Sequence, residues 1–365
     1  MPLRATYDDA PVIAPLLTDA EWHAVVRGAG EGRALRMACC DAPGYGRVAS
    51  SGLRHFAHRP GPSPCAVTHG ESIAHLTAKA VAARALAAHG YAVTTEAAGD
   101  GWRADVLGVR AAPRGVVRVA CEVQTSAQSL TDTLDRQERY RRAGVRALWL
   151  MSRPPAHVPS RALPIFRLAW DERTGAHHVT PDASARPAWR LSLGTFLDAL
   201  LGGRLRFSTH LRAQGEHEIT TELREAACLY CRAPCEVHLF RGTLRSACDA
   251  AIPPMRWRGQ ERAAGFAPDP SWYRLPAAIP LGDGDAPHVL KRRRHDAHGT
   301  IVRAFACPSC GAELTAAALR HHLFRRPPTR VATRRVTLTA PIHAPAPHWC
   351  LTTGAERCAG PGATP

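Results

Sequence analysis

Three acidic side chains and one amide in the first half of the chain could bind a divalent metal ion. Glu71 opens a segment with helical spacing, Asp105 lies in a strand pattern, and Glu122 and Gln124 lie two residues apart in the next strand pattern. Carboxylates are hard oxygen ligands that hold Mg2+ or Mn2+ while water stays in the coordination shell. Such an ion lowers the pKa of an attacking water and neutralises charge on a phosphate, so the set indicates metal-assisted cleavage of phosphodiester bonds.

A helix is expected to carry the first of these residues. Glu71, His75 and Lys79 recur at i, i+4 and i+8 and would share one helical face, while apolar residues form a separate stripe. Gly90 is expected to cap the carboxyl end of this helix. The helix would therefore present an acid, an imidazole and an amine on the same side.

Strands are expected to carry the other residues. Residues 91–97 and 103–109 flank a turn that contains Gly and Asp, which predicts a β-hairpin. Residues 116–124 form a third strand, in which the acid and the amide face the same way. A helix-length segment then leads to an apolar strand at 145–151, and a crossover of that length predicts a parallel strand pair.

Taken in order, these motifs resemble the PD-(D/E)XK nuclease superfamily and, more closely, the competence protein CoiA family. The resemblance covers roughly residues 35–200 and implies an α/β fold with a restriction-endonuclease-like mixed sheet flanked by helices. Each motif alone is weak, and the ordered set carries the resemblance. Its residues are HFAH (55–58), Cys65, Glu71, Ser72, His75, Lys79, Arg103, Asp105, Val106, Glu122, Gln124, Ser126, Arg136 and Tyr140.

The resemblance implies a role for each motif residue. Glu71, Asp105 and Glu122 would bind Mg2+ or Mn2+, and Gln124 would occupy the position that is lysine in many such sites. Lys79 is a candidate replacement for that lysine, since Lys79 and Lys291 are the only lysines among 47 basic residues; a compact ammonium has a tunable pKa. Alternatively, Lys79 pairs with its neighbours on a solvated helix face. The residues expected to contact substrate are His75, Arg103, Ser126, Arg136 and Tyr140.

A Cys/His-rich segment precedes this region. Zn2+ prefers four nitrogen or sulfur ligands in a tetrahedron, and Cys40, His55, His58 and Cys65 could supply them. In the family this module often begins with a C-x-x-C pair, whereas here Cys39 and Cys40 are adjacent, and adjacent residues seldom bind one ion together. The alternative is a packed remnant without metal, in which the histidines contact the nuclease domain or DNA.

A second Cys-rich module follows in the C-terminal half. Cys228 and Cys231 form one C-x-x-C knuckle, and Cys307 and Cys310 form another, which together are typical of a zinc ribbon. The long insertion between them contains aromatic residues beside Arg, which could stack on bases or anchor a loop. The alternative for the cysteines is two thiol pairs without metal.

Four segments are therefore expected: an N-terminal segment (1–66), a nuclease-like domain (67–207), a zinc-ribbon-like domain with an insertion (208–325) and a Pro/Thr-rich, partly disordered tail (326–365). The formal charge of +16 suits a DNA partner, although Arg-rich composition can also reflect a biased genome. No apolar run is long enough to span a membrane, and the N-terminus has no signal pattern, so we expect a cytoplasmic protein.

Three functions compete at this point. The first is a Mg2+-dependent nuclease that acts on DNA, in uptake, processing or recombination. The second is a catalytically inactive, nuclease-derived DNA-binding protein, which the glutamine at the lysine position favours. The third is a zinc-organised adaptor whose C-terminal half recruits other proteins.

Overall fold

The computed structural model divides into two compact units. The first comprises Met1–Phe207 and Pro347–Leu351, and the second comprises Ser208–Ala346 and Thr352–Pro365. The division after Phe207 coincides with one of the expected boundaries. The structure describes residues 2–59, 65, 71–113, 115–180, 190–241, 244–248, 251–252, 274–276, 290–294, 301–305, 307–312, 327, 329–351 and 358.

The first unit begins with a small α/β module. Its strands form a three-stranded antiparallel sheet in the order β2-β1-β3 and a separate hairpin, β4-β5. Thr18 and Glu21 form a capping box at the start of helix α1. Trp22 and Phe56 pack at the centre, with ring centroids 5.7 Å apart. The elements are β1 (Arg4–Tyr7), β2 (Ala10–Ile13), the 3-10 helix η1 (Ala14–Leu16), α1 (Asp19–Gly30), β3 (Leu35–Met37), β4 (Gly44–Val48) and β5 (Arg54–His58).

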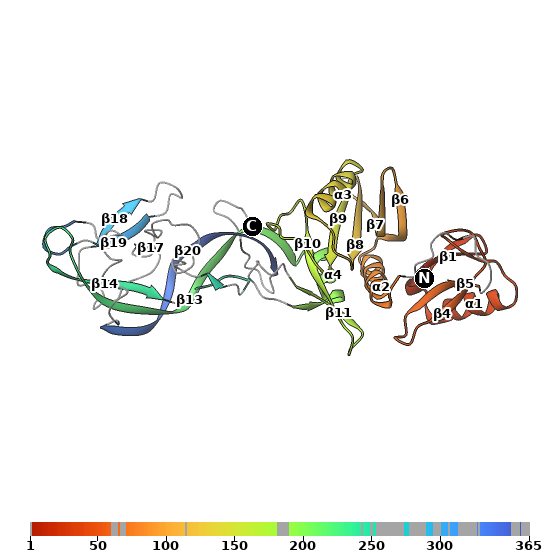
Figure 1. Ribbon diagram of the computed structural model, residues 1–365, viewed down its shortest axis with the longest axis horizontal. Coiled ribbons are helices and arrows are strands. Elements are labelled where there is room, and N and C mark those ends of the chain that lie inside the picture. Colours follow the sequence, from red (N-terminus) through yellow and green to blue (C-terminus); the bar gives the residue numbers. More distant parts are fainter. Residues whose placement is uncertain are drawn as a thin grey trace. The chain divides into compact units, whose positions relative to one another are not determined.

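A seven-stranded mixed sheet forms the centre of the first unit, in the order β12-β11-β10-β9-β8-β7-β6 (Figure 1). The hairpin β6-β7 is present, and Gly101 adopts a φ of 70° in its turn, a conformation that glycine adopts without steric cost. β8 and β9 run parallel, as the crossover predicted. The strands are β6 (Ala92–Gly99), β7 (Trp102–Ala112), β8 (Gly115–Gln124), β9 (Val145–Met151), β10 (Ile165–Asp171), β11 (Ala176–Thr180) and β12 (Leu191–Ser192).

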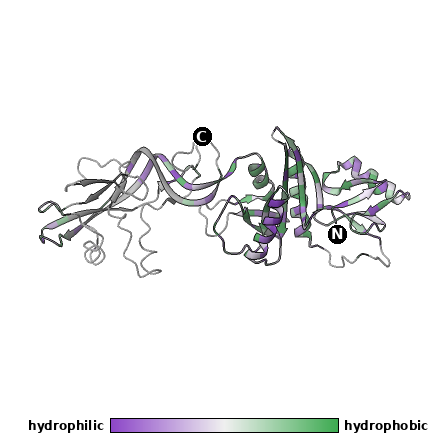
Figure 2. Cartoon of the chain, turned by 90° about the horizontal axis from the view of Figure 1, so that it is seen from above, coloured by the Kyte–Doolittle hydropathy of each residue, from purple (hydrophilic) through white to green (hydrophobic). Residues whose placement is uncertain are grey.

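Helices cover both faces of this sheet. Helices α2 (Ile73–Ala88) and α4 (Leu193–Leu201) pack on the face that carries Cys121 and Val123. Helix α3 (Leu130–Arg142) packs on the face that carries Ala120. The strands of the sheet are largely hydrophobic (Figure 2), as expected for a sheet buried on both sides. The fold is thus mixed α/β with a central mixed sheet.

The N-terminal module packs directly on helix α2. Leu3 and Leu53 form a small buried cluster with Leu76 and Ala80, and all four are at most 7% exposed. The boundary expected between residues 66 and 67 therefore does not separate two compact units, since both sides belong to the first. The module supports the helix that carries His75 and Lys79.

The second unit contains mainly strands. Two long strands and a shorter one form a sheet in the order β14-β13-β20, beside the smaller sheets β15-β16 and β17-β19-β18. The tail was expected to be partly disordered apart from a strand at 331–341, and its described part is largely the strand β20. The aromatic residues of the insertion, Trp257, Trp272 and Tyr273, lie outside the described residues. The strands are β13 (Leu205–Ala227), β14 (Pro234–Arg241), β15 (Leu244–Arg245), β16 (Ala251–Ile252), β17 (Arg274–Pro276), β18 (Leu290–Arg294), β19 (Ile301–Phe305) and β20 (Arg330–Leu351).

Among the residues described, none of the helices combines the length and the apolar character that a span across a bilayer needs.

Candidate acidic site and metal centres

Glu71 lies just before helix α2 rather than on it. Ser72 is the N-cap, and its hydroxyl accepts a hydrogen bond from the backbone N–H of His75 (3.2 Å). The sequence spacing nevertheless brings the expected side chains together. The Oε1 of Glu71 lies 3.4 Å from the His75 Nε2 and 2.7 Å from the Lys79 Nζ. The start of α2 thus gathers an acid, an imidazole and an amine.

Asp105 of strand β7 joins this group from the sheet. Its Oδ2 accepts a hydrogen bond from the backbone N–H of Val123 (2.8 Å), and its Oδ1 lies 3.7 Å from the His75 Nε2. Ligand atoms of Glu71, His75 and Asp105 all lie within 4.8 Å of one another, so this group could hold a metal ion. The Nε2 of His75 is buried and has no hydrogen-bond partner among the described residues, although it faces two carboxylates. An orphaned imidazole nitrogen between two acids fits a cation ligand.

Lys79 is buried among three carboxylates. Its side chain is 1% exposed, and its ammonium contacts Glu71, Glu96 and Asp105, the last at 3.8 Å. Burial alone would lower the pKa of Lys79, but the negative charges of Glu96, Asp105 and Glu71 raise it above its usual value. Lys79 is therefore protonated at neutral pH, and its burial contradicts the alternative of a solvated helix face. The pKa of this lysine was expected to be tunable, and it shifts upward, which favours the protonated ammonium.

Glu96 was not expected at this site. This residue has a φ of 53°, which departs from strand geometry, and it is unpaired with Asp105 between the pairs Thr95↔Val106 and Ala97↔Ala104, although the β6-β7 register is the same on both sides. Its carboxylate contacts Lys79, and its Oε2 also lies 2.8 Å from the Arg103 Nη2. Strand alternation alone could not find it. The signal that could have done so is the buried lysine, which needs nearby acids.

Asp105 remains ionised in this setting. Burial raises its pKa, but His75, Lys79 and the backbone N–H of Val123 favour the charged form and together bring the pKa below its ordinary value. The acid can therefore act as an anionic ligand at neutral pH.

Glu122 is not part of the group formed by Glu71, His75 and Asp105, although three carboxylates were expected to converge there. Its carboxylate is 4% exposed and contacts the hydroxyl of Tyr140 and the guanidinium of Arg136, both on helix α3. Asp105 instead faces His75 on helix α2. The reason is strand alternation, because Glu122 points to the α3 face while its neighbours Cys121 and Val123 point to the α2 face.

Burial also makes Glu122 an unusual acid. Desolvation and the charge of Asp105 raise its pKa to about 7, against the opposing effects of Arg136 and Tyr140. Burial likewise raises the pKa of the Tyr140 hydroxyl, which stays protonated. Glu122 and its two partners thus form a separate, buried polar cluster on the α3 face.

The remaining expected residues occupy the edges of these two clusters. The side-chain amide of Gln124 donates a hydrogen bond to the hydroxyl of Ser126 (2.7 Å). Among the described residues, no hydrogen bond joins this amide to the acidic site or to Glu122. Arg103 contacts Glu96, and its backbone oxygen lies 2.7 Å from the Tyr140 hydroxyl. Arg103 therefore lies between the acidic site and the Glu122 cluster.

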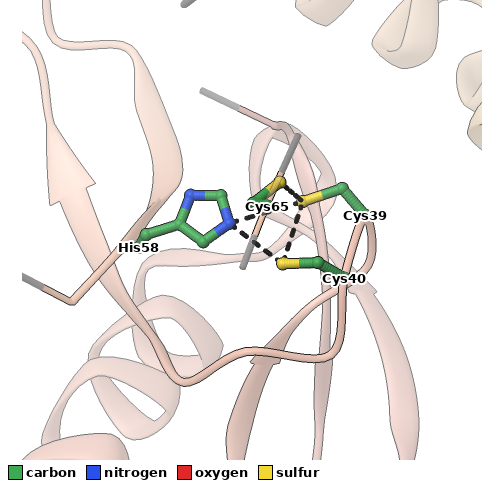
Figure 3. A group of neighbouring side chains, drawn as sticks. All are labelled: Cys39, Cys40, His58 and Cys65. Atoms are coloured by element: carbon green, nitrogen blue, oxygen red, sulfur yellow. Dashed lines mark hydrogen bonds between the residues drawn. The ribbon is translucent and has the colours of Figure 1, made fainter. Parts of the chain in front are cut away.

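The N-terminal module brings together Cys39, Cys40, His58 and Cys65, a group that could hold a metal such as zinc (Figure 3). The Sγ atom of Cys39 lies 3.7 Å from those of Cys40 and Cys65, and the His58 Nε2 lies 3.5 and 3.2 Å from the sulfurs of Cys39 and Cys40. Burial and the neighbouring thiols raise the pKa of Cys39 to about 12. Without a cation, the Cys39 thiol would stay protonated.

This group differs from the expected one by a single residue, with Cys39 in place of His55. His55 and His58 lie three positions apart on strand β5, so their side chains point to opposite faces. His55 is 1% exposed, and its Nδ1 lies 3.2 Å from the backbone oxygen of Leu53. Cys39 and Cys40 lie in a turn, where adjacent side chains can converge.

The second unit brings the four knuckle cysteines together as expected. The sulfurs of Cys228 and Cys310 are 3.7 Å apart, and those of Cys231 and Cys307 are 3.5 Å apart, so the group could hold a metal such as zinc. The two knuckles have the same local geometry. The backbone oxygen of Cys228 accepts a hydrogen bond from the N–H of Arg232, and the backbone oxygen of Cys307 accepts one from the N–H of Gly311. Arg232 and Gly311 both have a positive φ, of 63° and 66°.

Backbone amides favour the thiolate form of one of these cysteines, which is the form that binds a metal. The N–H groups of Cys310 and Ser309 point at the sulfur of Cys307 and lower its pKa to about 6, against the effect of burial. The sulfur of Cys358 lies 3.5 Å from that of Cys248 in the same unit, a pair that was not expected. No short spacing links these two residues, so local motifs could not reveal the pair.

Comparison of the chain with protein-family models, with curated proteins and with solved structures finds no match. Function must therefore be argued from the geometry of the sites.

Proposed function

We propose that the first unit is a metal-dependent, nuclease-like enzyme that cleaves phosphodiester bonds of DNA on a restriction-endonuclease-like sheet. The observation that carries the proposal is the buried Nε2 of His75, which lies between the carboxylates of Glu71 and Asp105 without a hydrogen-bond partner among the described residues. Two carboxylates and an imidazole form a ligand set for a divalent cation. The ordered motifs of the CoiA-like resemblance support the choice of reaction.

The ligand set favours Mn2+ over Mg2+. Imidazole suits transition metals, whereas Mg2+ prefers oxygen ligands and water. When bound, the ion would supply a water of lowered pKa and charge neutralisation at the phosphate. Glu71, His75 and Asp105 would hold the ion at the start of helix α2. We therefore expect activity with Mn2+ to exceed activity with Mg2+.

Lys79 would act through its charge. Its raised pKa keeps the ammonium protonated, so it is not a general base. A fixed cation beside the metal ligands can stabilise negative charge that develops on the phosphate, and burial strengthens that interaction. The role that lysine has in related sites would thus come from helix α2, while Gln124 contributes a neutral amide.

The test is cleavage of supercoiled and single-stranded DNA by the full chain with Mn2+ or Mg2+. Asp105→Asn is expected to lower the rate at least about 100-fold, since it removes a ligand carboxylate while preserving size. Asp100→Asn, in the turn between β6 and β7, is the matched control and is expected to cleave like the wild type. Cleavage that survives Asp105→Asn would show that the site is misplaced.

A second candidate is a nuclease-derived protein that binds DNA without cutting it. The position of Glu122 favours it, because only two of the three expected carboxylates reach the site. Metal-independent binding of DNA, with no cleavage under any metal, would support this candidate. The adaptor function is supported instead if the second unit is responsible for all binding and the bound partner is a protein.

We also propose that Zn2+ occupies both Cys-rich groups and stabilises their modules. With Zn–S bonds of about 2.3 Å, the edges of a tetrahedron of sulfurs measure about 3.8 Å. The S–S distances in the two groups are 3.5–3.7 Å. Metal analysis of the purified full chain is expected to find bound zinc, and Cys307→Ser, at one knuckle, should lower the content by about one ion per chain.

A further inference from the structure

A cavity lined by arginine lies between the β6-β7 turn and helix α3. Its volume is about 300 Å³, which suits a small ligand rather than an extended polymer. Three guanidinium groups and two aromatic rings form the wall. The lining residues are Gly101, Trp102, Arg103, Arg136, Arg139 and Tyr140.

Neighbouring groups hold the three arginines in place. Arg136 stacks over the ring of Trp149 at 4.8 Å and contacts Glu122. The Nη1 of Arg139 donates to the backbone oxygen of Gly101 (3.1 Å), while Arg103 pairs with Glu96. Because each guanidinium has five N–H donors, these contacts orient the arginines and leave further N–H groups for a ligand.

The charge balance of the cavity favours an anion. Acids contact two of the three arginines: Glu96 contacts Arg103, and Glu122 contacts Arg136. Glu122 is buried behind Arg136, and its pKa is raised to about 7, so it is only partly ionised at neutral pH. The guanidinium of Arg139 contacts backbone oxygens, and no acid pairs with it among the described residues. The net charge at the wall is positive.

We propose that this cavity binds the terminal phosphomonoester of a nucleotide, either at the end of a DNA strand or on a free mononucleotide. Guanidinium groups recognise phosphate through paired hydrogen bonds, and a monoester carries nearly two negative charges at pH 7. Trp102, whose ring lies 5.4 Å from that of Tyr140, offers an aromatic surface to the attached sugar or base. The strand-end form rests on the proposed function, because DNA would supply the phosphate.

The experiment compares short single-stranded DNA with a 5′ phosphate, with a 3′ phosphate and with hydroxyls at both ends, each labelled at the same internal base and followed by fluorescence anisotropy. The full chain is used without added Mn2+, so that binding does not depend on cleavage. The wild type should bind one phosphorylated form at least about tenfold more tightly than the hydroxyl form. Equal affinity for all three forms would overturn the proposal.

A matched pair of variants locates the site. Arg139→Ala, in the cavity, should abolish the preference for a terminal phosphate, while Arg142→Ala removes an exposed arginine of the same helix outside the cavity and should preserve it. Loss of the preference in both variants would indicate general attraction by helix α3 and contradict the proposal.

Two further arms distinguish the sources and the proposals. Competition by dAMP but not by deoxyadenosine supports recognition of the phosphomonoester. If dAMP binds as tightly as the phosphorylated oligonucleotide, the ligand is the free nucleotide. If dAMP binds more weakly than the oligonucleotide, the ligand is the end of a DNA strand. In Asp105→Asn the end preference should persist although cleavage is lost. A preference that persists in a protein that never cleaves DNA would leave this inference standing while the proposed function fails.

Discussion

Replacement of Lys79 by methionine tests the electrostatics of the acidic site most fully. Methionine has a similar length but no charge, so the substitution leaves three carboxylates around a buried position without their cation. Removal of one partner from a buried ion pair costs about 3–5 kcal/mol. The carboxylates of Glu71, Glu96 and Asp105 are 27%, 28% and 19% exposed, so water screens them in part. We therefore expect the lower end, about 3 kcal/mol of unfolding free energy.

A divalent cation should reverse part of this loss. In the wild type, the ammonium of Lys79 repels a metal ion beside it, and its removal makes the site more negative. Mn2+ should therefore stabilise Lys79→Met more than it stabilises the wild type. At a concentration 100 times the dissociation constant, binding contributes about 2.7 kcal/mol.

Urea unfolding followed by far-UV circular dichroism, with and without Mn2+, measures both effects. Arg84→Met is the matched control, because Arg84 is exposed on the same helix, and it should change stability by less than about 0.5 kcal/mol. The electrostatic reasoning is refuted if Lys79→Met is as stable as this control. It is also refuted if Mn2+ stabilises the variant and the wild type equally.

Three further outcomes follow from the buried acid and the thiol groups. Burial raises the pKa of Glu122 from 4.5 to about 7, so the folded state binds the proton more tightly than the unfolded state. The free energy of unfolding should therefore fall by roughly 3 kcal/mol between pH 5 and 8, relative to Glu122→Gln. Urea unfolding of both proteins at each pH measures this difference. Cys39→Ser should remove about one zinc ion per chain by metal analysis, whereas His55→Gln should keep it; the reverse would restore the ligand set expected from sequence. Cys231→Ser should lower the melting temperature of the second unit and remove its zinc, and an unchanged zinc content would contradict the proposed knuckle site.

Local patterns in the sequence were sufficient for much of the fold. The hairpin at Gly101, the parallel crossover to β9 and the capping box at Thr18 depend on interactions between residues close in the chain. The two knuckles are local in the same sense, because each turn is fixed by its own hydrogen bonds. Such features could be predicted without knowledge of tertiary contacts.

The misplaced residues depend on features that simple periodicity does not contain. Glu96 contacts Lys79 from a position with a φ of 53°, a local departure from strand geometry that leaves the β6-β7 register unchanged on both sides. Glu122 follows regular alternation to the α3 face, whereas Asp105 contacts helix α2, so the two acids separate. His55 was grouped with His58 although an odd separation on a strand puts them on opposite faces.

The central claim is that Glu71, His75 and Asp105 bind one divalent ion, and pulsed electron paramagnetic resonance of the full chain loaded with Mn2+ tests it most directly. A nitrogen coupling from a directly bound imidazole is expected in the wild type and in Glu122→Gln, and it should disappear in His75→Ala. A bound Mn2+ without nitrogen coupling, or a coupling that persists in His75→Ala, would contradict the account.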